Sequence, residues 1–116
     1  MIENKVDAKL IQKEENSVYL KISFPMECGL FQGHFPDLPL LPGVVQTHLA
    51  IRYFERYQNT KLNFAGFKSL KFFRPIFPGA TVDLEIKKDL KSDQVTFHYS
   101  GGGHPYSKGV VAIHAD

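Results

Sequence analysis

The sequence contains one cysteine, Cys28, and no tryptophan. A single thiol cannot form an internal disulfide, so the fold does not depend on a disulfide framework and suits a reducing compartment. No stretch reaches the ~18 apolar residues of a membrane span, and residues 1–17 lack the apolar core of a signal peptide. We therefore expect a cytoplasmic protein that neither enters nor crosses a membrane.

The chain also has little excess charge. Fourteen basic residues face 12 acidic ones, and a net charge of +2 is too weak to indicate a nucleic-acid partner. A length of 116 residues supports a single hydrophobic core, and 43% hydrophobic residues are typical of a globular protein. The sequence shows no repeat or linker, so residues 1–116 are expected to form one domain.

The pattern of apolar residues predicts six strands and one helix. Alternation over residues 6–24, broken by the polar residues 14–17, is typical of a hairpin of two antiparallel strands. Residues 25–43 hold so many prolines and glycines that they predict a long functional loop. Further strands are expected at about 62–74, 80–88, 94–100 and 106–114. Together these elements predict an α+β fold, with the helix wrapped by an antiparallel sheet.

The predicted helix begins at Pro42 or Gly43 and ends near Gln58 and Asn59. Its first three turns carry few polar side chains, so most of the circumference there is expected to be buried. The apolar residues on which this prediction rests are Val44, Val45, Leu49, Ala50, Ile51 and Phe54.

The residues with the clearest chemical potential lie just before this helix. His34 stands in a loop stiffened by prolines, which lowers the entropy lost when its imidazole is positioned. A helix start presents unpaired N–H groups, and Gly43 has no side chain that would keep a substrate carbonyl from its amide. A thioester oxygen bound there would be polarised, and a neutral imidazole nearby would be able to remove the α-proton.

Three blocks of sequence resemble the β-hydroxyacyl-acyl-carrier-protein dehydratases of type II fatty-acid synthesis. These blocks are GHFPDLPLLPGV at 33–44, KSLKFFRPIFPGATVDLEI at 68–86 and YSKGVVAIHA at 106–115. The resemblance implies a hotdog fold, a homodimer or higher homo-oligomer with active sites at the interface, and an acyl carrier protein as partner. It also implies that His34 is catalytic and that the Gly43 amide binds the thioester oxygen. Apart from the phosphopantetheine of a carrier protein or coenzyme A, no cofactor is expected.

One position departs from that family. Fourteen residues after its histidine the family has Glu or Asp, and this chain has His48. The run PGVVQTHLA resembles a short subgroup of dehydratase-like proteins from aryl-polyene and related polyketide-type clusters. His48 is therefore the second expected catalytic residue, as the group that assists departure of the hydroxyl. Phe35, Pro42 and Val44, which flank the two functional positions, are expected to contact substrate.

Two other functions stay open at this stage. A hotdog acyl thioesterase would use a carboxylate on the helix, where the sequence offers only Glu55 near the far end. A dehydratase-like subunit that has lost its acid would instead serve as a non-catalytic partner for a different hotdog chain, in a heteromer. The spacing of His98, His104 and His114 does not match that of metal ligands, so a structural role is expected for them. Five basic residues are expected to form either a solvated surface or a docking patch for a carrier protein: Arg52, Arg56, Lys68, Lys71 and Arg74.

Overall fold

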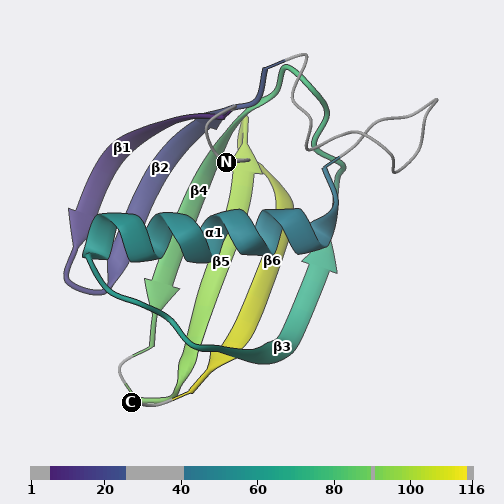
Figure 1. The fold of residues 1–116 in the computed structure, drawn as a ribbon. Helices are drawn as coiled ribbons and strands as arrows, with labels where there is room; N and C mark the ends of the chain where they lie inside the picture. The colour runs from purple at the N-terminus through teal and green to yellow at the C-terminus, as the bar shows by residue number, and fades with distance from the viewer. Residues whose placement is uncertain (1–5, 26–40, 90, 115–116) are drawn as a thin grey trace.

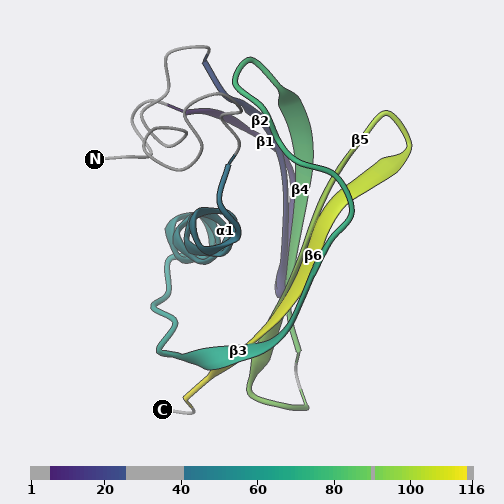
Figure 2. The same cartoon turned by 90° about the vertical axis from the view of Figure 1, so that its right-hand side faces the viewer.

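A curved antiparallel sheet wraps around one helix in the computed structural model, which describes residues 6–25, 41–89 and 91–114 (Figures 1 and 2). Within these residues the strands lie in the order β1-β2-β4-β5-β6-β3. The elements are β1 (Asp7–Glu14), β2 (Ser17–Ser23), α1 (Gly43–Gln58), β3 (Phe64–Phe72), β4 (Thr81–Lys88), β5 (Gln94–Gly101) and β6 (His104–Ile113). The predicted α+β arrangement and the type of every predicted element are confirmed. The predicted loop at residues 25–43 lies largely outside the described residues.

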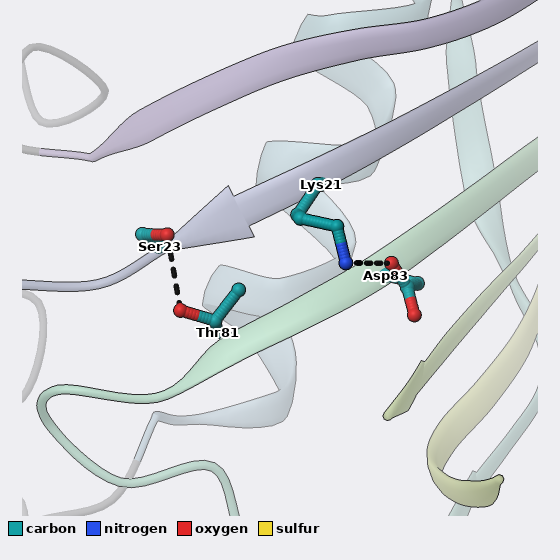
Figure 3. A network of polar contacts seen from close by, with 4 residues as sticks. All are labelled: Lys21, Ser23, Thr81 and Asp83. Carbon is teal, nitrogen blue, oxygen red and sulfur yellow. Dashed lines mark hydrogen bonds and ion pairs between the residues drawn. The ribbon is translucent and has the colours of Figure 1, made fainter. Parts of the chain in front are cut away.

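Alternation of side chains decides which face of the sheet meets the helix. In β4 the residues Val82, Leu84 and Ile86 are buried, and the residues between them point to the outer face. On that outer face Lys21 Nζ lies 3.2 Å from Asp83 Oδ1, and the hydroxyls of Ser23 and Thr81 are 3.1 Å apart (Figure 3). In each pair, the β2 residue lies directly opposite the β4 residue. These contacts therefore support the same register as the buried side chains.

Helix α1 lies across the concave face of the sheet and buries one side against it (Figure 2). Leu49, Ala50, Tyr53 and Phe54 are each at most 2% exposed, and together with inward side chains of the sheet they form the core. The helix ends at Asn59, whose left-handed conformation (φ 52°) lets its N–H donate to the Glu55 carbonyl. This end agrees with the predicted one.

The prediction that most of the helix circumference is buried was wrong at Val44, which is 67% exposed. His48, one turn further, is exposed as well, whereas the polar residues Gln46 and Thr47 are buried. Apolar periodicity identifies an apolar helix but not the direction from which the sheet approaches it. The first turns of α1 therefore present an apolar stripe that the sheet of this chain does not cover.

The two edges of the sheet are β1 and β3. Among the described strands β3 pairs with β6 alone, and its register shifts between Phe64 and Gly66 and again between Phe67 and Ser69. Gly66 has a φ of 130°, a conformation that glycine adopts without strain. Phe64 and Phe67 are 45% and 47% exposed, and their rings meet edge to face with centroids 5.2 Å apart. This edge therefore offers both unpaired backbone groups and apolar surface.

Within the described ranges, no helix has the length and apolar character required to cross a membrane.

Candidate active site

The sequence prediction placed six residues in the site, and four of them lie at the start of α1. Pro42 and Gly43 begin the helix, and Val44 and His48 lie on its outward side. His34 and Phe35 fall in the range 26–40, outside the described residues, so their predicted roles stay predictions.

The N-terminus of α1 has the properties expected of a carbonyl-binding site. Its first backbone hydrogen bond runs from Gln46 N–H to the Pro42 carbonyl (3.0 Å), so helix geometry gives the N–H of Gly43 no intrahelical acceptor. Pro42 provides no side-chain cap, and no acidic residue stands in the first turn. Because the helix dipole adds partial positive charge at this end, the Gly43 amide is suited to an electron-rich oxygen.

A cavity of about 450 Å³ opens beside this helix start. Its walls come from the start of α1 and from the end of β3 with the residues that follow it. Strand β3 ends next to the start of α1 (Figure 1). The described lining residues are Leu41, Pro42, Gly43, Gln46, Phe72, Phe73, Arg74 and Pro75. The site therefore combines the expected amide with walls that are mostly apolar, as small-molecule sites usually are.

Phe72 is a site residue that the sequence prediction missed. Its ring lies against Gly43, so that a Cβ added at that position would be 2.7 Å from the ring's Cε1. The phenyl group is 53% exposed and therefore has room to move. The only signal in the sequence was its place in the block KFFRP, and that block gives no direction for the ring.

His48 lines a second cavity of about 330 Å³, between α1 and β3. The other described lining residues are Val44, Thr47, Ile51, Phe64 and Phe67. His48 lies five positions after Gly43, which corresponds to about 7.5 Å along the helix axis. The imidazole is thus a polar group on a mostly apolar wall, about one and a half turns beyond the Gly43 amide.

A buried polar network supports the helix start from the side of the sheet. The side chain of Gln46 binds the Leu41 carbonyl and the Ser107 hydroxyl, while the Tyr99 hydroxyl donates to the Gln46 carbonyl at 2.6 Å. Burial of Tyr99, with a smaller contribution from Tyr53, raises the pKa of the Tyr99 hydroxyl well above its ordinary value. Tyr99 therefore keeps the proton that it donates to the helix.

The basic residues divide into different roles. Arg74 donates to the carbonyls of Gly101, His104 and Pro105 and lies over the Tyr106 ring, so it serves the β5–β6 turn rather than a simple solvated surface. A separate cavity at the far end of α1 is lined by Arg52, Glu55, Arg56, Thr60 and Lys61.

Among the residues that the structure describes, no three His, Cys, Asp or Glu side chains gather as a metal site would require.

The sequence model of the ApeI-like family, described as ApeI dehydratase, matches residues 10–110. This chain belongs to the ApeI-like dehydratase family. The match covers most of the chain, including the helix start, both cavities and the edge strand β3. A structure titled as the dehydratase heterocomplex ApeI:P from Xenorhabdus doucetiae is similar with a TM-score of 0.86 and 28% identity, covering 96% of this chain and 99% of that one.

Other comparisons agree with this family and with a hotdog fold. A protein from Erwinia carotovora has a TM-score of 0.75 at 26% identity, over 94% of this chain and 91% of its own. The 3-hydroxyacyl-[acyl-carrier-protein] dehydratase FabZ of Erythrobacter litoralis is 35% identical over 74% of this chain and 61% of its own length. FabZ of Latilactobacillus sakei is 34% identical over 58% of this chain and 53% of its own. The chain thus spans less than two thirds of these curated relatives.

Proposed function

We propose that this protein catalyses the reversible loss of water from a 3-hydroxyacyl thioester, giving the trans-2-enoyl thioester. The observation that carries the proposal is the pairing of the uncapped Gly43 amide with the imidazole of His48, one and a half turns along the same helix. Both groups face apolar cavities of a size suited to an acyl chain. Family membership supports the same reaction.

Each residue has a distinct role in the proposed mechanism. The Gly43 N–H donates to the thioester oxygen and stabilises the negative charge that develops there. His34 removes the α-proton, and the electron pair of that C–H bond forms the double bond between the α- and β-carbons. Protonated His48 gives its proton to the departing β-hydroxyl, which leaves as water. The substrate loses one H and one OH, and solvent returns both imidazoles to their starting state.

Phe35, Pro42 and Val44 are proposed to contact the substrate. Pro42 and Val44 line the described cavities on either side of Gly43, and the exposed position of Val44 fits such a role. The acyl group is expected to be carried on the phosphopantetheine of an acyl carrier protein or on coenzyme A. Fatty-acid and polyene-type biosynthesis are the pathway classes that use such substrates.

The exposed edge strand β3 indicates assembly with a second hotdog chain. Its unpaired backbone and the aromatic pair Phe64–Phe67 lie next to His48, so a partner docked there would enclose the second cavity. We propose a homodimer or higher homo-oligomer as the working assembly. Another hotdog chain in place of the second copy is the alternative, and the ApeI:P heterocomplex is a related case.

The test is turnover of a 3-hydroxyacyl-carrier-protein by the wild type, His34→Ala and His48→Ala, followed by mass and by enoyl absorbance. Loss of turnover in both variants, with circular dichroism and oligomeric state unchanged, would support the two-histidine dehydratase. Loss only in His34→Ala would remove His48 from the mechanism. An inactive wild type that is fully folded and assembled would contradict the proposed activity.

A non-catalytic partner subunit is the second candidate, favoured by the histidine at the position where related enzymes carry an acid. It predicts activity only when a different hotdog chain is added. A thioesterase is less well supported, because the Glu55 carboxylate accepts a hydrogen bond from Leu62 N–H (2.9 Å). Glu55 also lies twelve positions after Gly43, which is about 18 Å along the helix.

A further inference from the structure

Gln46 is a polar residue in an environment where apolar side chains would be expected. It lies one turn into α1, is only 2% exposed, and faces the sheet among core residues. Burying an amide costs free energy unless its polar groups find partners. Its hydrogen bonds therefore explain how it is accommodated, and their directions show what it holds in place.

The side chain of Gln46 connects three separate parts of the chain. Nε2 donates to the Leu41 carbonyl at 3.0 Å, and Oε1 accepts from the Ser107 hydroxyl of β6 at 2.6 Å. Ser107 is itself 1% exposed, so this bond is shielded from water. The Gln46 side chain thus ties Leu41, two positions before the helix, to Ser107 of the sheet.

Leu41 is held from both sides of its backbone. Its N–H donates to the Ile76 carbonyl at 2.8 Å, and its carbonyl accepts from Gln46. Only Pro42 separates Leu41 from Gly43, so the two bonds fix the direction in which the chain enters the helix. In sequence, Leu41 also follows the segment that carries His34. A change at Gln46 is therefore transmitted through Leu41 to the Gly43 amide.

We propose that Gln46 is a positioning residue for the dehydration, fixing the direction of the Gly43 amide by holding Leu41 to Ser107. This inference rests on the proposed function. Gln46 acts through Leu41 and Gly43 and does not take part in proton transfer. Because apolar walls provide most of the substrate contact, loss of Gln46 should affect the rate of the chemical step more than substrate affinity.

The decisive variant is Gln46→Leu, which keeps the volume of the side chain and removes both of its hydrogen bonds. We expect kcat to fall by about 10- to 100-fold, the effect of a misplacement of about 1 Å, with KM changed less than about threefold. Rates are expressed per folded protein, measured by circular dichroism, so that a loss of stability alone does not lower them.

Gln58→Leu is the matched control, because Gln58 makes the same kind of contact at the other end of α1. Its Nε2 donates to the carbonyls of Glu14 (2.6 Å) and Ser17 (3.0 Å). This variant should lose stability and keep the wild-type kcat. Equal loss of kcat in both variants would show a general effect of anchoring the helix and would overturn the inference.

Gln46→Glu provides a pH signature that a purely structural role would not give. A carboxylate still accepts from Ser107, but its second oxygen faces the Leu41 carbonyl, whereas the protonated acid donates to that carbonyl. The ratio of the kcat of Gln46→Glu to that of the wild type should therefore rise as the pH falls. A ratio independent of pH would contradict the proposed contact with Leu41.

A second readout separates this inference from the proposed function. If the wild type proves inactive as a dehydratase, amide hydrogen exchange still tests the role of Gln46. Exchange at the amides of positions 41 and 46, which donate to the carbonyls of Ile76 and Pro42, should accelerate at least tenfold in Gln46→Leu relative to amides near Tyr53. Unchanged exchange at those positions would overturn the inference whatever the enzymatic result.

Discussion

The ring of Phe72 occupies the space in which any side chain at Gly43 would have to begin. The two residues are far apart in sequence, on the last position of β3 and the first of α1. A substrate that approaches the Gly43 amide therefore meets this ring, and a methyl group at position 43 would have to displace it. The pair offers a direct test of the geometry of the helix start.

Gly43→Ala should destabilise the protein more when Phe72 is present than when it is absent. In a double-mutant cycle with Phe72→Ala, measured by urea unfolding, we expect a coupling energy of about 0.5–2 kcal/mol. Phe73→Ala is the control, because Phe73 is equally exposed and the three atoms nearest to a Cβ at position 43 all belong to Phe72. An equal cost of Gly43→Ala in the wild-type and Phe72→Ala backgrounds would show that the ring does not constrain position 43.

His48→Glu should retain substantial activity, because it restores the acid that the related dehydratases carry at this position. His48→Ala should lower kcat by about 10²- to 10⁴-fold, the usual contribution of general acid catalysis. The rate is followed by the change in enoyl-thioester absorbance. His98→Ala, on β5 and away from both cavities, should match the wild type. Equal activity of His48→Ala and wild type would exclude the proposed proton donor.

Tyr99→Phe should change how stability depends on alkaline pH. The pKa of Tyr99 is raised in the folded state by burial, so the folded protein binds this proton more tightly than the unfolded chain. The contribution of Tyr99 to the free energy of unfolding is fully present below the unfolded pKa of about 10. Above that pH the contribution falls, by at most about 1.4 kcal/mol per pH unit. Urea unfolding between pH 9 and about 11 should show a shallower decline in Tyr99→Phe. In Ser107→Ala, which keeps Tyr99, the free energy of unfolding should decline with pH as it does in the wild type.

Arg74→Lys should destabilise the protein although the positive charge is kept. Arg74 binds three backbone carbonyls and lies 4.0 Å from the centroid of Tyr106, contacts that need a planar guanidinium. We expect a loss of about 1–2 kcal/mol in the free energy of unfolding. Lys71→Met, at an exposed position three residues earlier in the chain, should cost less than about 0.5 kcal/mol. If Lys71→Met raises KM for a carrier-protein substrate, Lys71 belongs to a docking surface.

Phe67→Lys should dissociate the proposed assembly at the β3 edge. A charge there opposes burial against a second chain, while the core of the single chain is untouched because Phe67 is 47% exposed. Light scattering coupled to size-exclusion chromatography should give a mass near 13.2 kDa instead of a multiple of it. Ile11→Lys, on the opposite edge strand β1, should leave the mass unchanged. An unchanged mass in Phe67→Lys would place the interface elsewhere.

Elements of regular structure were predictable because their signals are local. Alternation in residues 6–24 and the Pro42-to-Asn59 boundaries of the helix depend only on neighbouring residues, and both agree with the structure. The exposure of Val44 was not predictable in this way, since the pattern of an apolar helix does not show which side the sheet covers.

The support of the site depends on contacts that no local pattern contains. Tyr99 and Ser107 reach Gln46 across 53 and 61 positions of sequence, and alternation on their own strands indicates only that they face inward. Phe72 meets Gly43 only because β3 ends beside the start of α1. The sequence therefore identified the residues proposed for chemistry, whereas the residues that position them became visible only with the sheet assembled.

Within the described residues, strand β3 pairs with β6 alone, although 31 residues lie between Phe72 and His104 and β6 is the last of the described strands. During synthesis the wall that carries Phe64, Phe67 and Phe72 therefore stays unpaired until residues 104–113 have left the ribosome. Until then its aromatic side chains are open to aggregation or to capture by a chaperone. The part of the protein proposed to hold substrate and partner is thus completed only when β6 has emerged and paired with β3.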